Sequence, residues 1–265
     1  PLVSGINGRL AGVEALIRWK HPELGLVSPG DFIPIAEETG FIVPMGEWVL
    51  RTACRQMVEW ISMGVEDVAI SVNLSGRQFR EEGLLSSVQT ILLETGLPAH
   101  LLELEITETA LVDDVVRSKT VLADLKELGV HVALDDFGIG YSSLNYLQGL
   151  PLDTLKIDRA FVQGVADNPN DRSLVRTIIA MGRSLGLDLV AEGVGVARDR
   201  AAGVLGHRHR AQHLVGRRDR VVLADRGDRA DPAELPAVVE GERAEGVGPG
   251  EEARGRVVGG GRQGH

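Results

Sequence analysis

Residues 101–134 read LLELEITETALVDDVVRSKTVLADLKELGVHVAL. The apolar run over 101–106 is too short and too rich in Leu and Ile for a surface helix, so it predicts a buried strand. A helical pattern follows from about Asp113 to Leu128, Gly129 stops it, and residues 130–134 form a second buried strand. Strand, helix and strand in this order are typical of a parallel sheet covered by helices.

The same alternation continues on both sides of this stretch. Before it, the sequence predicts an Asn7-Gly8 turn into a strand over 10–19, helices over 31–39 and 45–63, a strand over 67–74 and a helix over 83–95. After it, a glycine-bearing loop over 138–140 opens a short helix, followed by a strand over 154–157, a helix over 171–185 and a strand over 187–191. This pattern predicts an α/β fold, and 265 residues suit one α/β barrel, since such barrels commonly run to about 250 residues.

The overall composition argues against several classes of protein. A net charge of −10 and a pI near 5.2 disfavour binding to duplex DNA or RNA or to an anionic membrane, which normally needs a basic face. No apolar run reaches the length of about 18 residues that predicts a membrane span, so we expect no membrane insertion and a cytoplasmic location. The lone Cys54 lies in a helical pattern and is expected to be a packed thiol.

The character of the sequence changes near Gly195. Beyond it there is no Lys, Phe, Trp or Tyr, and Arg, Gly, Ala, Val and Asp predominate. A segment with so few large apolar side chains cannot offset the entropy lost on ordering. We therefore predict a barrel domain over 1–194 and a divergent Arg/Gly/Ala-rich segment over 195–265 that is partly disordered. A basic nucleic-acid tail is the rival interpretation, but acidic residues are interleaved with the arginines.

Oxygen-bearing side chains lie where four successive apolar runs end. These are Glu14, Asn73, Glu105 and Asp135. Such donors suit Mg²⁺ or Mn²⁺ better than Zn²⁺, for which His or Cys would be expected, and the seven His residues show no ligand-like spacing. The doublet Asp135-Asp136 suits two ions, because one carboxylate can bridge both while its neighbour holds the second. A pair of ions can clamp a phosphodiester and activate a water molecule.

Two further strand-end residues suit the same chemistry. Lys156 would place an ammonium beside an attacking water, and Glu192 would accept the proton of that water. Each residue also has a plainer explanation, since Asp136 or Glu108 alone would be the N-cap of a helix, Asn73 would shape a turn, and Lys156 would be solvated. Consecutive strand ends that all carry such groups are nevertheless hard to attribute to capping.

The ordered motifs resemble one known family in identity, order and spacing. The segments are Glu14-Ala15-Leu16-Ile17-Arg18-Trp19, Asn73-Leu74-Ser75, Glu105-Ile106-Thr107-Glu108, Asp135-Asp136-Phe137-Gly138, Lys156-Ile157-Asp158 and Ala191-Glu192-Gly193-Val194. Over residues 1 to 194 the chain resembles the EAL domain family. The resemblance implies a TIM-like (β/α)8 barrel and hydrolysis of cyclic di-GMP to linear pGpG.

The resemblance also implies a role for each matching residue. The metal ligands would be Glu14, Asn73, Glu105, Asp135 and Asp136, with Mg²⁺ or Mn²⁺ as two ions. Lys156 and Glu192 would organise the nucleophilic water, Arg18 would touch the substrate phosphate, and Glu108 would hold the loop after Asp136. That loop, residues 137–143, couples dimerisation to metal binding in the family, so a homodimer is expected.

The chain departs from the family pattern after the last of these motifs. Gly195 stands where the family has a second Glu, and Gln212 lies near the place of a substrate-binding Gln-Gly pair but is followed by His213. We therefore expect a barrel incomplete at its C-terminal strands and hypothesise a shifted reading frame near codon 195. Sequencing the gene, and finding no alternative frame that restores the Glu and the Gln-Gly pair, would dispose of this hypothesis.

Three functions remain open at this point. The first is a metal-dependent cyclic di-GMP phosphodiesterase, and the second is a catalytically impaired module that binds cyclic di-GMP or a protein partner as a receptor or regulator. The third, an enolase-type Mg²⁺ enzyme, would need a strand-end base facing a carboxylate substrate. Because the chain begins at Pro1 without an initiator Met, we also expect an upstream sensory or regulatory domain, through which the full-length protein would be tethered to a membrane.

Overall fold

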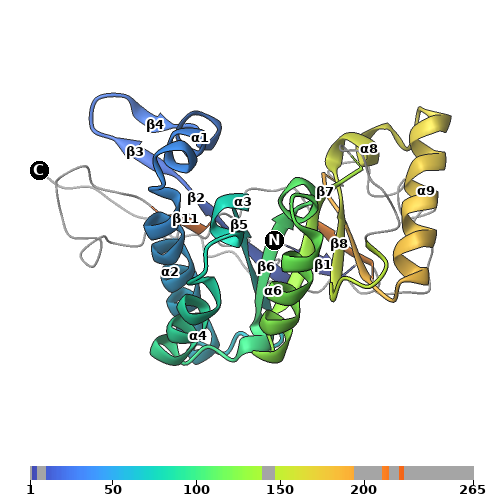
Figure 1. The fold of residues 1–265 in the computed structure, drawn as a ribbon. Helices are drawn as coiled ribbons and strands as arrows, with labels where there is room; N and C mark the ends of the chain where they lie inside the picture. The colour runs from blue at the N-terminus through green and yellow to red at the C-terminus, as the bar shows by residue number, and fades with distance from the viewer. Residues whose placement is uncertain (1, 5–9, 139–146, 194–210, 215–220, 224–265) are drawn as a thin grey trace, which may run out of the picture.

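The computed structural model describes residues 2–4, 10–138, 147–193, 211–214 and 221–223 (Figure 1). The strands are β1 (Leu2–Ser4), β2 (Leu10–Ile17), β3 (Trp19–His21), β4 (Gly25–Val27), β5 (Ala69–Leu74), β6 (Leu102–Thr107), β7 (His131–Phe137), β8 (Thr154–Ile157), β9 (Asp188–Ala191), β10 (Ala211–Leu214) and β11 (Val221–Leu223). The helices are α1 (Pro29–Thr39), α2 (Ile42–Ser62), α3 (Gly76–Phe79), α4 (Leu84–Thr95), the 3₁₀ turn η1 (Ala99–Leu101), α5 (Glu108–Val112), α6 (Val115–Glu127), α8 (Arg159–Gly164) and α9 (Pro169–Ser184).

A curled parallel sheet forms the centre of the fold. Its strands follow the order β2-β5-β6-β7-β8-β9, and each is parallel to the next. β10 adds in parallel to β9 and β11 in parallel to β2, while β1 runs antiparallel to both β10 and β2. In the described ranges beyond β9 there are only these two short strands and no helix. The predicted TIM-like barrel, incomplete at its C-terminal end, is therefore confirmed.

The helices pack on one face of the sheet, as their apolar spacing requires. In α2 the residues Leu50, Ala53 and Met57 recur at helical spacing and are buried in the core. Cys54 is also fully buried there, and burial raises the pKa of its thiol to about 12, which confirms the expected packed cysteine. α9 approaches the sheet closely at Gly182, where a Cβ would lie 2.5 Å from Leu189 Cδ2.

The opposite face of the sheet carries polar side chains. Paired residues of parallel strands point to the same face, and the pairs Ser71 with Glu103, Asn73 with Glu105, and Ala133 with Thr154 place these six positions together. The alternate β6 residues Leu102, Leu104 and Ile106 belong to the apolar core under the helices. Alternate side chains along each strand thus point either to the core under the helices or to the polar face.

The predicted helices and strands are present with small shifts at their ends, but short elements were not predicted. These are the β3–β4 hairpin, the strands β10 and β11, the helices α3, α5 and α8, and the turn η1. The expected Asn7-Gly8 turn, the short helix after 138–140 and most of 195–265 lie outside the described residues. None of the helices that the structure describes is both long and apolar enough to cross a membrane.

Candidate active site

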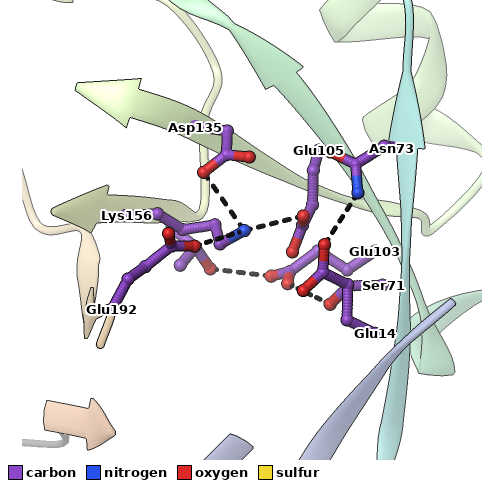
Figure 2. Close-up of polar contacts among 9 residues, drawn as sticks. Glu14, Ser71, Asn73, Glu103, Glu105, Asp135, Lys156 and Glu192 are labelled. Carbon is purple, nitrogen blue, oxygen red and sulfur yellow. Dashed lines mark hydrogen bonds and ion pairs between the residues drawn. The ribbon is translucent and has the colours of Figure 1, made fainter. Parts of the chain in front are cut away.

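A buried ammonium group forms the centre of the polar face. Lys156, on β8, is 1% exposed, and its Nζ lies 2.7 Å from Glu105 Oε2 on β6 and 2.9 Å from Glu192 Oε1 just after β9. Asp135 Oδ1 on β7 lies 3.1 Å from the same nitrogen (Figure 2). A charge so deeply buried must be paired, because desolvation otherwise makes it very costly. Three strand ends therefore meet at one cation.

The pKa values within this cluster follow from burial and charge. Burial acts to lower the pKa of Lys156, but Glu105 and Asp135 outweigh it and hold the pKa well above 10.5, so the ammonium stays charged. Burial is also the main cause that raises the pKa of Glu105 well above 4.5, against the opposing effect of Lys156. The pKa of Glu192 is likewise raised, first by burial and with Lys156 opposing. The site therefore holds carboxyl groups that bind protons more tightly than usual.

Glu14 and Asn73 adjoin this cluster from β2 and β5. Asn73 donates from Nδ2 to Glu14 Oε1 over 2.8 Å (Figure 2). Because the amide donates through its nitrogen, its carbonyl oxygen remains available as an acceptor or a metal ligand. The two residues belong to strands that are neighbours in the sheet, with Glu14 paired to Ser71. This brings a carboxylate and an amide oxygen to the same edge.

The backbone is strained at the aspartate doublet. Asp136 has a φ of 54°, in the left-handed region that non-glycine residues rarely adopt, and the pairing of β7 with β8 shifts register between Leu134 and Phe137. Such a residue costs about 1–3 kcal/mol, and residues of this kind cluster at active sites, although Asp67, away from this cluster, has a similar φ of 56°. Partial burial and the neighbouring Asp135 carboxylate raise the pKa of Asp136. Asp136 lies within β7 and does not cap a helix, contrary to the plainer interpretation.

The other predicted residues are not all placed in this cluster. Arg18 follows β2 and donates from Nη1 to the Ile17 carbonyl over 2.7 Å. Glu108 is buried in the first turn of α5, but residues 139–143 of the loop that it was predicted to hold lie outside the described residues. Gln212 belongs to β10, where its backbone pairs with Val190 of β9. Its side chain is outside what the structure describes, so its role stays a prediction.

Sequence reasoning missed a second polar group on the same face. Glu103 accepts hydrogen bonds from Ser71 Oγ and Thr154 Oγ1, each over 2.8 Å. All three residues are buried. The signal was present in the run Leu102-Glu103-Leu104-Glu105, where strand parity places both glutamates on one face.

The donor set fits a divalent cation, although the side chains are not arranged as a ready site. Within the described ranges, no group of three or more His, Cys, Asp or Glu side chains is arranged to hold a metal ion as it stands. Three of the carboxylates instead pair with the Lys156 ammonium. Glu105 Oε1 is nonetheless buried without a hydrogen bond, and Asp135 Oδ1 has only its ion pair with Lys156; oxygen donors of this kind suit Mg²⁺ or Mn²⁺. A buried oxygen without a hydrogen bond, next to further carboxylates, is what such an ion would satisfy.

Comparison with known proteins agrees with this arrangement. Residues 1–201 match the EAL domain family. Over 195 residues the chain is 50% identical to the bifunctional diguanylate cyclase/cyclic di-GMP phosphodiesterase MucR of Pseudomonas aeruginosa, covering 73% of this chain and 28% of MucR. It is 42% identical over 194 residues to the signaling protein YkoW of Bacillus subtilis, covering 73% of this chain and 24% of YkoW.

A solved structure gives the same result in three dimensions. The PaMucR phosphodiesterase in its c-di-GMP complex superposes with a TM-score of 0.75 at 47% sequence identity, covering 80% of this chain and 86% of that one. The chain spans 28% of MucR and 24% of YkoW, so these curated relatives are much longer proteins. The family match includes every candidate residue except Gln212. On the match over residues 1–201, this chain belongs to the EAL domain family.

Proposed function

We propose that this chain hydrolyses cyclic di-GMP to linear pGpG with the help of Mg²⁺ or Mn²⁺. The observation that carries the proposal is the buried Lys156 ammonium held by carboxylates from three strand ends, with Asn73 and Glu14 beside them. One relative, MucR, is named as a cyclic di-GMP phosphodiesterase, and its phosphodiesterase structure is a complex with c-di-GMP. The direct test is to incubate the purified chain with cyclic di-GMP and Mg²⁺ and to measure pGpG by chromatography, with EDTA as the control. No pGpG with either Mg²⁺ or Mn²⁺ would contradict the proposal.

The proposed ligands of the divalent cations are the oxygen donors at the strand ends. They are Glu14, Asn73, Glu105, Asp135 and Asp136. Two such ions, when bound, lower the pKa of a water molecule and stabilise charge on the scissile phosphate. Arg18 would hold a phosphate of the substrate at the rim and Gln212 would contact it from β10, while Glu108 would support the loop after β7.

Lys156 and Glu192 are proposed to act on the attacking water. The ammonium of Lys156 donates hydrogen bonds and stabilises negative charge that develops on the phosphoryl oxygens. Glu192 lies 2.9 Å from this ammonium and would accept a proton from the water. The partial burial of Glu192 suits a base, because a carboxylate with a raised pKa holds the proton more readily.

The pH dependence of turnover should report this proton acceptor. Glu192 must be ionised to accept a proton, and its pKa is raised by burial, so kcat/KM should rise with pH through a value above the ordinary carboxyl range. We expect the Glu192→Gln variant to lose most of its turnover, and its remaining kcat/KM should no longer rise with pH over this range. A wild-type profile that is flat down to the ordinary carboxyl range would contradict the assignment.

Calcium should inhibit the reaction. Ca²⁺ takes more ligands at longer distances than Mg²⁺, so it would occupy the oxygen donors without the tight geometry that two-ion hydrolysis needs. The measurement is pGpG release with Ca²⁺ alone, and with Ca²⁺ titrated against Mg²⁺. Undiminished turnover in Ca²⁺ alone would argue against a two-ion mechanism.

A binding module is the second candidate function. Gly195 stands where a second Glu is expected and Gln212 is not followed by Gly, which favours a chain that keeps the nucleotide without cleaving it. Saturable binding of cyclic di-GMP without any pGpG would select this function.

Size-exclusion chromatography with light scattering tests the expected homodimer, and limited proteolysis tests the proposed division into residues 1–194 and 195–265.

A further inference from the structure

Beneath the candidate site, a second set of polar side chains joins the same strands. We call Ser71, Glu103 and Thr154 the lower layer. Glu103 Oε1 accepts from Ser71 Oγ on β5, and its Oε2 accepts from Thr154 Oγ1 on β8, both over 2.8 Å. Their exposed fractions are 0%, 9% and 6%, so water cannot readily replace these hydrogen bonds. Each carboxylate oxygen has its own hydroxyl donor.

The lower layer repeats the layout of the site above it. We call Asn73, Glu105 and Lys156 the upper layer. On each of β5, β6 and β8 the upper residue follows the lower one by two positions, which is one repeat of the pleat or about 6.6 Å. In both layers a glutamate of β6 bonds to a residue of β8, since Lys156 Nζ lies 2.7 Å from Glu105 Oε2. Figure 2 shows Glu103 and Ser71 next to the upper group.

Both bonds from β6 to β8 cross over β7, which lies between them in the sheet. On β7, Ala133 pairs with Glu105 of the upper layer on one side and with Thr154 of the lower layer on the other, and it is fully buried. Its methyl group leaves room for the longer side chains to pass. β6 and β8, which are not neighbours in the sheet, are therefore joined by two bonds, one in each layer. These bonds fix the spacing and the relative twist of the two strands.

We infer that Glu103 is a positioning residue for the site above it. The lower layer holds β5, β6 and β8 at the spacing that Asn73, Glu105 and Lys156 require, and it does so through hydrogen bonds that do not use any residue of the upper layer. If a divalent cation takes Glu105 from the ammonium, the lower bonds still hold the strands. The consequence of this role for catalysis rests on the proposed function, but the effect of Glu103 on metal binding can be measured without turnover.

The test compares Glu103→Ala with Glu103→Gln in the full chain. We measure Mn²⁺ binding from the loss of the free-ion signal in electron paramagnetic resonance, well below the unfolding temperature. Glu103→Ala removes both acceptors and should weaken Mn²⁺ binding by about 10-fold, the lower end of the effect of losing a group bonded directly to a metal ligand, because Glu103 acts on the ligands only through the strands. Glu103→Gln keeps the shape and can bond to both hydroxyls, which donate or accept as needed, so it should restore binding close to wild type.

A matched control separates positioning from general destabilisation. Ser118 is 3% exposed, and its hydroxyl donates to the Leu111 carbonyl over 3.0 Å, away from both layers. Ser118→Ala also removes a buried hydrogen bond, so it should lower the unfolding temperature but leave the affinity for Mn²⁺ unchanged. In turnover assays, Glu103→Ala should lower kcat with little change in KM for cyclic di-GMP, because the substrate-binding groups lie elsewhere.

The outcomes distinguish this inference from the proposed function. Wild-type Mn²⁺ affinity in Glu103→Ala would overturn the inference, whether or not the chain hydrolyses cyclic di-GMP. An equal loss of affinity in Glu103→Ala and Glu103→Gln would overturn it as well, because the hydrogen bonds would then not be the cause. If the wild-type chain binds Mn²⁺ but releases no pGpG, the proposed function fails and the Mn²⁺ comparison still decides the role of Glu103.

Discussion

Replacing Lys156 with methionine is expected to lower the free energy of unfolding of the metal-free protein by about 3–5 kcal/mol, because it leaves buried carboxylates without their cation. Glu105 and Asp135 are 2% and 9% exposed, so solvent cannot take the place of the ammonium. Methionine fills a similar volume and its flexible chain adapts to the cavity, so the loss would come mainly from charge. Urea unfolding in the presence of EDTA measures it.

The sign of the pH dependence provides a second check on this variant. The pKa of Glu105 is raised well above 4.5, mainly by burial, and removing Lys156 takes away the main group that lowers it. A carboxyl whose folded pKa lies above its unfolded value gives stability at low pH and loses it as pH rises through the folded pKa. The deficit of Lys156→Met relative to wild type should therefore shrink on acidification.

A surface lysine offers the matched control. Lys126 forms an ion pair with Asp153, but 38% of its side chain is exposed. Exposed pairs contribute about 0.2–1 kcal/mol, so Lys126→Met should have a small effect. Equal losses in the two variants would show that the buried cluster is not held by its charge. Divalent cations should recover stability in Lys156→Met, because they supply positive charge to the same oxygens, and should do so less in Lys126→Met.

The edge of the sheet where the site lies could be predicted from the sequence, because the carboxyl ends of parallel strands meet. Glu105 and Asp135 lie near the carboxyl ends of the neighbouring strands β6 and β7, so the strand order alone brings them near each other. The partners of Lys156 could not be predicted. Its strand position shows that the side chain enters the polar face, but its three carboxylate contacts depend on rotamers and on the curl of the sheet.

Other features of the structure could not be predicted from the sequence, for different physical reasons. The left-handed backbone of Asp136 arises with a register shift between β7 and β8, which depends on two segments distant in the chain. The β3–β4 hairpin has strands of three residues each, too short to show a period. Ser71 and Thr154 are small polar residues that a strand accommodates on either face, and only their contacts with Glu103 reveal their role.

Replacing Asp135 with asparagine is expected to abolish turnover while the fold is kept. The change conserves volume but removes one anionic oxygen from a proposed ligand position, and the amide nitrogen cannot bind a cation. Losing a group that only orients a ligand costs about 10–100-fold, so the loss of a direct ligand should exceed this. Stability should fall little, because the loss of the Asp135 ion pair with Lys156 is offset by the loss of repulsion between Asp135 and Glu105, while Glu105 and Glu192 still pair with the ammonium.

The opposite end of the sheet supplies the control for this substitution. Asp188 begins β9, is exposed, and bonds through its backbone nitrogen to the Asp153 carbonyl, so Asp188→Asn makes the same chemical change away from the site. We expect near-wild-type release of pGpG from Asp188→Asn and none above background from Asp135→Asn at saturating Mg²⁺, with equal circular dichroism. Near-wild-type rates in Asp135→Asn would overturn the ligand assignment, since an intact fold with one charge fewer would then still catalyse. Equal losses of turnover in both variants would instead indicate an effect of net charge, because Asp135 lies beside the Lys156 ammonium and Asp188 lies away from the site.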